Sequence, residues 1–213
     1  MCNMKIYRLV YGETTLPESA VFYGGSREVK VPIVFAIYLV DTGSKKILID
    51  AGCDTMPGFE MKNFTSPVPE LEKLGYRPED ITDVIITHAH HDHAQGIKFF
   101  PGATVHIHEE EMDAAAAFIP EGTKLHTFRE ETDVDTLHIV PIGGHRKGSC
   151  IVTWEDFVFV GDECYTEECF RRNIPTGVSC NREASKAFID KYADGKYRKL
   201  YCHEDKMKTE RIL

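Results

Sequence analysis

A series of short runs rich in apolar and β-branched residues constrains this chain most strongly, because such runs form strands. Turn-forming residues separate the runs. Among them, DTGSKK (41–46) and WEDF (154–157) predict tight turns, the second a hairpin between neighbouring strands. The predicted strands cover residues 5–11, 31–40, 45–50, 83–87, 103–108, 136–142, 149–154, 156–161 and 199–203.

Helical patterns interleave with these strands at residues 68–76, 109–119 and 181–193, and Asn181 is the expected N-cap of the last one. Strands and helices in this order predict an α/β fold, a four-layer αββα sandwich of two mixed sheets with helices outside. Neither an internal repeat nor a low-complexity linker divides the sequence. We therefore expect a single domain over residues 1–213.

Composition narrows the classes of partner. The formal net charge is −9 and Lys and Arg form no long run, so a broad phosphate-binding surface for nucleic acid is not expected. No segment approaches the roughly 18 apolar residues of a membrane-spanning helix, and the first residues lack the pattern of a secretion signal. The expected partner is a small molecule and the expected location is the cytoplasm; the oligomeric state is left open.

The chain has seven cysteines, an odd number without a CxxC pair. In the absence of a secretion signal, this usage predicts reduced thiols that pack as small apolar residues. The cysteines are Cys2, Cys53, Cys150, Cys164, Cys169, Cys180 and Cys202.

The stretch HAHHDH, residues 88–93, directly follows the predicted strand DVIIT. His88 and His90 are two residues apart, so in an extended backbone their side chains point to the same side and can meet one metal ion. Asp92 and His93 can address a second point once the chain turns into a helix. Imidazole and carboxylate ligands suit zinc and also iron or manganese. A solvated histidine-rich turn is the alternative.

Three further candidates share one placement, the end of a predicted strand. His145 follows HIVPIGG, Asp162 follows DFVFVG and His203 follows KLYC. In layered α/β folds such strand ends converge on the functional edge of the sheet. Four other histidines lack complementary partners in the sequence and are expected to be ordinary structural or surface residues; they are His106, His108, His126 and His138. His91 is not expected to be a ligand, because its neighbours already supply the ligands and its side chain should point elsewhere.

These motifs, taken in order, resemble the motif series of the metallo-β-lactamase superfamily. The series is LIDAG (48–52), HAHHDH (88–93), GGH (143–145), VGD (160–162) and CHED (202–205). It spans about three quarters of the chain.

The resemblance implies the αββα sandwich and a site for two divalent metal ions, with zinc expected. Asp50 would support the ligands from behind. By the resemblance, His88, His90 and His145 would hold one ion, Asp92, His93 and His203 the other, and Asp162 would bridge them.

Within that superfamily the chain is most similar to N-acyl homoserine lactonases. In GDECYTEECF, Tyr165 stands three residues after Asp162, and the lactonases have at that spacing a tyrosine that contacts the substrate carbonyl. The chain departs from them in GGHRKGSC (143–150), which lacks their second histidine, and in Cys202, where glycine is usual. Tyr165 could alternatively be a packing residue of its loop.

The resulting hypothesis is a metal-dependent hydrolase of small lactones or esters. Two adjacent divalent ions lower the pKa of a shared water to about 7, which provides a hydroxide nucleophile without Ser or Cys. Tyr165 would stabilise the oxyanion, and Asp92 would donate a proton to the leaving alkoxide.

Three alternatives remain. The first is a thioester hydrolase of the glyoxalase II kind, for which basic residues in RRN (171–173) and NR (181–182) are the obvious candidates. The second is a di-iron redox module, which would need a flavin domain that does not fit in this length. The third is a non-catalytic protein that binds metal or senses a ligand.

Overall fold

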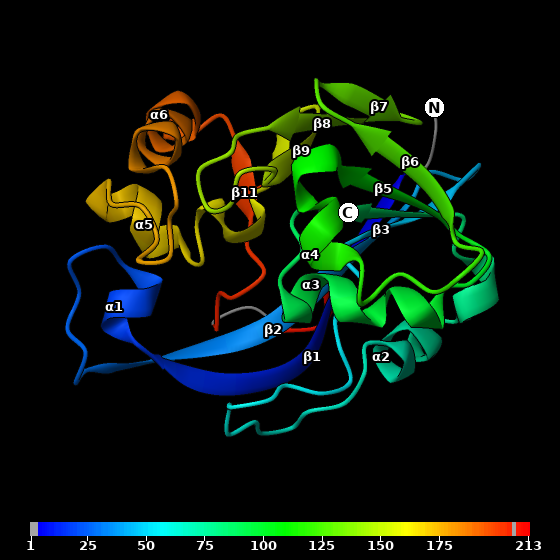
Figure 1. Ribbon diagram of the computed structural model, residues 1–213, viewed down its shortest axis with the longest axis horizontal. Coiled ribbons are helices and arrows are strands. Elements are labelled where there is room, and N and C mark those ends of the chain that lie inside the picture. The colour runs from blue at the N-terminus through cyan, green and yellow to red at the C-terminus, as the bar shows by residue number, and fades with distance from the viewer. Residues whose placement is uncertain (1–3, 206–207) are drawn as a thin grey trace.

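The computed structural model describes residues 4–205 and 208–213, which form two β-sheets packed face to face with helices on their outer faces (Figure 1). The predicted αββα layering is thereby confirmed. Cys2 lies outside the described residues.

The larger sheet has the strand order β12-β1-β2-β3-β4-β5-β6. Strands β1 to β3 are antiparallel neighbours, whereas β3 to β6 run parallel, so the sheet is mixed as predicted. Its strands are β1 (Lys5–Pro17), β2 (Lys30–Asp41), β3 (Lys46–Ile49), β4 (Asp83–Ile86), β5 (Thr104–His108), β6 (Lys124–Phe128) and β12 (Glu210–Arg211).

The smaller sheet has the order β11-β10-β9-β8-β7, with β10 and β11 parallel and the other pairs antiparallel. The predicted hairpin in WEDF is present, because Trp154 pairs with Phe157 across a turn in which Glu155 has a φ of 50°. The strands are β7 (Thr132–Val134), β8 (Leu137–Pro141), β9 (Cys150–Trp154), β10 (Phe157–Phe159) and β11 (Arg198–Leu200).

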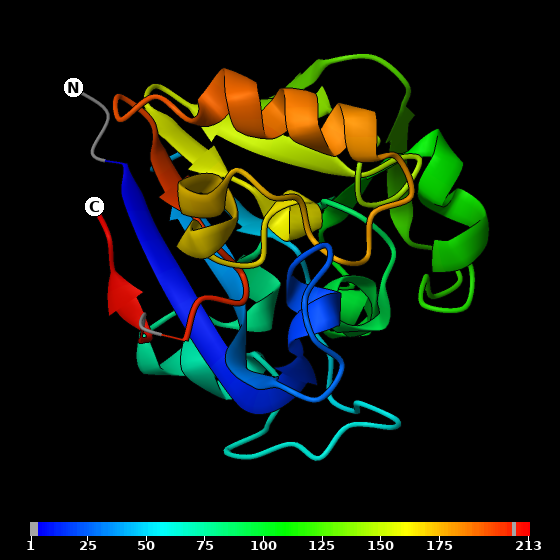
Figure 2. The ribbon, with the colours of Figure 1, turned by 90° about the vertical axis from the view of Figure 1, so that its left-hand side faces the viewer.

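The helices are short apart from α6, which lies across the smaller sheet (Figure 2). Asn181 caps α6 as predicted, since its side-chain oxygen accepts a hydrogen bond from the backbone N–H of Ala184 at 3.1 Å. No helix among the described residues has the length and apolar character needed to cross a bilayer. The α-helices are α1 (Glu18–Val21), α2 (Val68–Lys73), α3 (His91–Ala94), α4 (Met112–Ala115), α5 (Glu167–Arg172) and α6 (Arg182–Tyr192), and the 3-10 segments are η1 (Pro78–Asp80), η2 (Gln95–Phe99), η3 (Glu109–Glu111) and η4 (Gly161–Glu163).

Two predicted helices are shorter than expected. The first ends at Lys73 because Gly75 takes a φ of 86°, a left-handed conformation that stops the helix. The predicted helix over 109–119 divides into η3 and α4 and ends at Ala115, shortly before Pro120 and Gly122.

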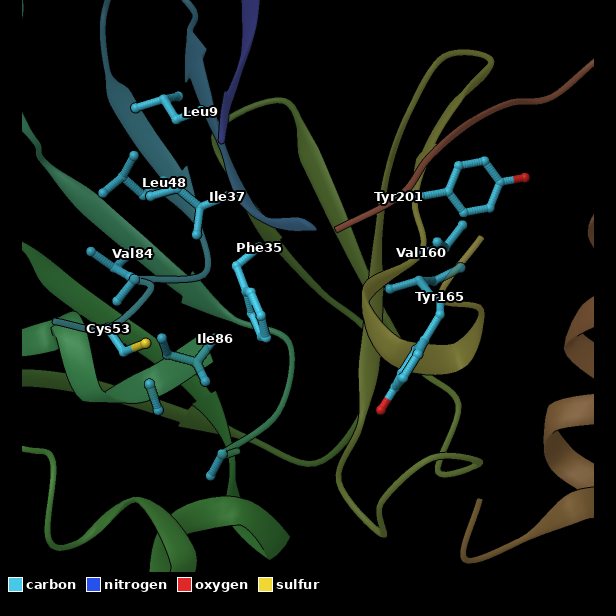
Figure 3. Close-up of a cluster of buried hydrophobic side chains, with 14 of the residues drawn as sticks. Leu9, Phe35, Ile37, Leu48, Cys53, Val84, Ile86, Val160, Tyr165 and Tyr201 are labelled. Atoms are coloured by element: carbon cyan, nitrogen blue, oxygen red, sulfur yellow. The ribbon is translucent and has the colours of Figure 1, made fainter. Parts of the chain in front are cut away.

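Alternation along the strands builds the layers. In β2, Tyr38 and Val40 belong to the core cluster that also contains Phe157 and Phe159 of the facing sheet. Ile37 and Leu39, which alternate with them, belong to the cluster that lies against the helices. Figure 3 shows Ile37, Leu48, Val84 and Ile86 of the larger sheet in that second cluster. Both faces of the central strands are therefore buried. Side chains that must reach a substrate or a metal ion can then lie only at the ends of these strands.

Strands β1 and β2 extend beyond their neighbours as a long arm that carries α1 at its tip (Figure 1). A bulge between Val10 and Gly12 interrupts their register. The arm is tied to the segment before α6, because Tyr23 donates a backbone hydrogen bond to Pro175 and Gly177 donates one to Ala20. The arm therefore borders the edge at which the candidate ligands gather.

Candidate metal centre

HAHHDH begins at the carboxyl end of β4. His88 is fully buried, and the backbone is still extended at His90, with φ −70° and ψ 159°. The chain then turns into α3, which contains Asp92 and His93. Because of this change of conformation, His88 and His90 belong to one group of donor atoms, and Asp92 and His93 belong to another, as the spacing predicts.

The later strand ends supply three more side chains to the same place. His145 follows β8, Asp162 lies in η4 just after β10, and His203 follows β11. All three are buried, with exposed fractions of 2, 4 and 3%. The structure therefore brings all seven predicted ligands together, although they are spread over more than a hundred residues of sequence.

One group of donor atoms surrounds His90. Its Nδ1 lies 3.0 Å from Nε2 of His88 and 3.0 Å from Nε2 of His145. Oδ2 of Asp162 lies 3.5 Å from the first of these nitrogens and 3.4 Å from the second.

A second group of donor atoms surrounds Oδ1, the other carboxylate oxygen of Asp162. Oδ1 of Asp162 is 3.2 Å from Nε2 of His93 and 3.1 Å from Nε2 of His203. Oδ2 of Asp92 completes this group at 3.3 and 3.6 Å from those two nitrogens. The two oxygens of Asp162 therefore face two separate sets of donors.

The donor sets fit metal ions better than hydrogen bonds. An ion with tetrahedral ligands at about 2.0 to 2.1 Å needs donor atoms roughly 3.3 to 3.4 Å apart, close to the spacings found here. Nε2 of His93 and Oδ1 of Asp162 are buried, and neither has a hydrogen-bond partner within residues 4–205 and 208–213. Buried polar atoms are rarely left unpaired, so a cation would supply the missing partner.

Acceptors behind the ligands fix which imidazole nitrogen faces the centre. Nδ1 of His93 donates to Asp50 Oδ2 at 2.8 Å, and Nδ1 of His203 donates to the carbonyl of Val34 at 2.9 Å. The hydroxyl of Thr87 donates to Asp50, so at 3.2 Å it can accept a hydrogen bond from Nδ1 of His88. In each imidazole the unprotonated Nε2 is thus directed at the centre.

The electrostatic setting differs between the two groups. Burial lowers the pKa of His145 to about 4 and lowers the pKa of His88 and His90 as well. Burial also acts to lower the pKa of His93 and His203, but neighbouring carboxylates, Asp162 foremost, outweigh it and raise both pKa values. The first group is therefore a set of neutral imidazoles, whereas the second is intrinsically more basic.

Two buried glutamates support the loops that carry the ligands, and neither was foreseen from the sequence. Glu163 accepts hydrogen bonds from the backbone N–H groups of Gly144 and His145, at 3.2 and 3.0 Å. Glu111 accepts one from the N–H of Ala89, at 2.9 Å, between His88 and His90. The only sequence signal was the position of Glu163 next to Asp162.

An apolar cavity of about 290 Å³ opens onto the centre. Its walls include Leu16 and Ile33 of the arm and Phe59 of the loop between β3 and α2, and Tyr165 and His203 also line it. The ring centroid of Tyr165 lies 4.8 Å from that of His203, and Figure 3 shows its hydroxyl pointing away from Tyr201. Burial, together with the nearby charge of Asp162, raises the pKa of Tyr165 well above its usual value, so the hydroxyl keeps its proton.

The remaining histidines have partners outside the two groups of donor atoms. Nε2 of His91 faces Thr55, at 2.9 Å from its carbonyl oxygen. His106 donates to Asp83 and His138 to Asp133, at 2.8 and 2.7 Å. The Nδ1 atoms of His126 and His106 lie 3.2 Å apart, and Nε2 of His108 lies 3.1 Å from the carbonyl oxygen of Arg129.

The six described cysteines are free. Cys180 is exposed, and the other five are buried, as predicted for thiols that pack as small apolar residues. Burial raises the pKa of Cys202, which lies one residue before a ligand candidate, above its usual range. The basic residues considered for a thioester are already engaged, because Arg171 pairs with Glu168 and Arg182 stacks on Tyr23.

Comparison with known proteins agrees with this geometry. Residues 36–203 match the family model described as the metallo-beta-lactamase superfamily. A probable metallo-hydrolase of Methanocaldococcus jannaschii is 25% identical over 167 residues, which are 78% of this chain and 75% of that protein. The N-acyl homoserine lactonase AiiB of Agrobacterium fabrum is 28% identical over 112 residues, which are 46% of this chain and only 40% of the lactonase.

Solved structures extend the likeness over almost the whole chain. A quorum-quenching N-acyl homoserine lactone hydrolase superimposes with a TM-score of 0.85 over 98% of both chains, at 20% identity. Identity at that level establishes a shared fold and leaves the substrate open.

Proposed function

This chain is a metallo-hydrolase of the metallo-beta-lactamase superfamily, and on that basis we propose that it opens small lactones or esters at a binuclear metal centre. One observation carries the proposal. The two oxygens of Asp162 face two separate sets of ligand atoms, and this arrangement lies at the base of an apolar cavity that also contains Tyr165.

We assign the ligands as the two groups suggest. His88, His90 and His145 would hold one ion, and Asp92, His93 and His203 the other. Asp162 would serve both, since one of its oxygens faces each group. Imidazoles and carboxylates at these spacings suit zinc, which is our proposal for the metal. When bound, the ions would supply a hydroxide nucleophile near neutral pH and polarise the substrate carbonyl.

The other steps belong to the residues of the chain. The protonated hydroxyl of Tyr165 would donate a hydrogen bond to the developing oxyanion. Burial acts to raise the pKa of Asp92, but His93 outweighs it and lowers the pKa, so this side chain starts as a carboxylate. Asp92 would take the proton of the hydroxyl group that adds to the carbonyl carbon and deliver it to the leaving alkoxide. The apolar wall would bind the acyl chain and exclude water. His203 packs against the Tyr165 ring and so holds it over the centre.

Two broader proposals go with this assignment. The described residues share one pair of facing sheets, which supports a single hydrolase domain over residues 1–213. A cytoplasmic location, in which the cysteines stay reduced, remains a prediction.

A substrate panel tests the proposal. The protein, with its metal content quantified, is incubated with N-acyl homoserine lactones, simple lactones, neutral esters and glutathione thioesters, and proton release is followed. We expect turnover of lactones or esters. Turnover of thioesters alone would contradict the lactone or ester assignment and favour a thioester hydrolase. No turnover of any compound, at two ions per chain, would favour a non-catalytic metal-binding protein.

A further inference from the structure

A second cavity, of about 480 Å³, borders the metal centre on a different set of walls. His90 lines both this cavity and the apolar one. The rest of its lining combines the charged side chains of Glu110, Arg146 and Lys147 with residues 177–180, among them Val178 and Cys180. A substrate whose reacting carbon lies near His90 would therefore have one part in the apolar cavity and its other part beside these charged side chains.

Arg146 is held in place in this cavity. Its Nε donates to Oε2 of Glu111 at 2.6 Å, and the Glu111 side chain is only 1% exposed. The same carboxylate also accepts hydrogen bonds from the N–H groups of Ala89 and Gly148. The Arg146 side chain remains 30% exposed, and its Nη atoms have no hydrogen-bond partner within the described ranges. A guanidinium fixed through Nε presents its Nη donors in a rigid arrangement that suits a carboxylate or a phosphate.

Lys147 adds a second cation. Its side chain is exposed, and Nζ takes part in no ion pair with a described residue. Opposing charge comes from Glu110 at the cavity wall and from Glu111, whose oxygens are already occupied. Lys147 is thus the mobile partner beside a preorganised Arg146, and both follow His145 directly, in the stretch that departs from the lactonases.

We propose that this cavity binds a small oxyanion, a carboxylate or a phosphate, on the alcohol side of the scissile bond, through Arg146 and Lys147. The substrate class is then an anionic ester or lactone, with its acyl chain in the apolar cavity. This inference rests on the proposed function, since it names the substrate class of that same site.

Matched esters test the inference. The hexanoyl esters of glycolate, of glycolamide and of 2-hydroxyethyl phosphate share an acyl chain and differ in the charge of the alcohol part. We expect either anionic ester to have a higher kcat/KM than the glycolamide ester, with a ratio that shrinks as salt is added. Each anionic ester gives one ratio of its kcat/KM to that of the glycolamide ester, and the larger ratio shows whether the cavity prefers a carboxylate or a phosphate. Equal or better use of the glycolamide ester would overturn the proposal.

Variants locate the effect. In Lys147→Met the ratio of anionic to neutral kcat/KM should fall about fivefold, the size expected for one partly exposed charged hydrogen bond. Arg146→Lys should lower the ratio as well, because one ammonium cannot serve both Glu111 and the ligand. Lys124→Met is the matched control, since it removes the same charge from exposed β6. A ratio that stays constant in both cavity variants would exclude the site.

A binding measurement keeps the test independent of catalysis. Cys180 is the exposed cysteine among the six described and lines this cavity. In a Cys2→Ser background, N-hexanoylglycine should slow its alkylation by N-ethylmaleimide, whereas N-hexanoylglycinamide should not, and Lys147→Met should remove the difference. Equal protection by both compounds would contradict an oxyanion site. If no ester is hydrolysed at full metal content, the proposed function fails, and alkylation still decides whether the cavity binds an oxyanion.

Discussion

The imidazoles of the proposed ligands are held in one orientation by hydrogen bonds to the protein. Nδ1 of His93 is hydrogen-bonded to Asp50, and Nδ1 of His203 to a backbone carbonyl. Each ring can therefore neither rotate nor exchange tautomers without breaking a buried hydrogen bond, which costs about 1 to 3 kcal/mol. Preorganisation of this kind raises metal affinity because fewer side chains have to be ordered on binding.

Asp50→Asn tests this support. Asp50 has a φ of 65°, a conformation that asparagine tolerates, so the backbone should be retained. The new amide can accept through only one oxygen, although His93 Nδ1, the Thr87 N–H and the Thr87 hydroxyl all donate to Asp50. We expect the affinity for the ion at His93 to fall about 10- to 100-fold in a chelator competition. Asp54→Asn is the control, and equal affinities in the two variants would contradict the assignment of Asp50.

Tyr165→Phe tests the oxyanion donor. Removing one such donor typically lowers kcat about 100-fold or more, so a loss of that order is expected with metal content unchanged. Tyr192→Phe removes a hydroxyl from α6, away from the ligands, and should leave kcat near the wild-type value. Unchanged turnover of every active ester or lactone in Tyr165→Phe would reduce Tyr165 to a packing residue.

The sequence could identify ligand candidates but not the residues that support their loops. His145, Asp162 and His203 each follow a strand-like run, so their convergence could be inferred from the layered fold. Glu111 stands in a run of glutamates that looks like an exposed helix start, yet its side chain is buried. Its burial depends on Ala89 and Gly148, which come from distant loops, and no local pattern encodes such a contact.

At the scale of elements, strands with a buried alternating or continuous pattern were predicted. Of the edge strands in the described sheets, β11 was predicted, whereas β6, β7 and β12 were missed. Strand β6 exposes every residue except Phe128, and β12 is exposed throughout. Edge strands of this kind have no apolar face for the sequence to signal. Helix α5 was missed because it is short, with six residues, and Cys169 is its one buried residue.

The join between α3 and η2 depends on a glycine. A Cβ at Gly96 would lie 2.1 Å from the carbonyl oxygen of Ala51, which belongs to the loop behind the centre. Backbone would have to move to admit it, so Gly96→Ala should lower the free energy of unfolding by about 3 kcal/mol in urea titration. Gly102→Ala has open space and should change stability by less than about 1 kcal/mol. Similar stability of both variants would mean that the loop yields easily.

At the scale of the whole molecule, the centre joins the two sheets. His88, His90 and His93 follow β4 of the larger sheet, whereas His145, Asp162 and His203 come from the smaller one. The layered architecture could be predicted because both sheets carry strong apolar strands. The two cavities could not, since their walls come from the arm, the loop around Phe59 and residues 177–180, whose positions depend on tertiary contacts.

Acidification should remove the two ions in separate steps. A ligating imidazole must be unprotonated, so an ion competes with protons at any pH below the pKa of the metal-free ligand. That pKa is raised at His93 and His203, where protons already compete near neutral pH. At His145 it is about 4, so protons compete only in strong acid. Affinity at the group with His93 is therefore the first to fall as the pH is lowered.

Zinc content after equilibrium dialysis between about pH 7.5 and about pH 4.5 should consequently pass through a plateau near one ion per chain. Single-site variants identify which ion leaves first. His203→Ala should keep its remaining ion, at His88, His90 and His145, to the lower pH, whereas His145→Ala should lose its remaining ion early. Loss of both ions in one step, or the reverse order in the two variants, would show that the carboxylates around Asp162 do not set the basicity of His93 and His203.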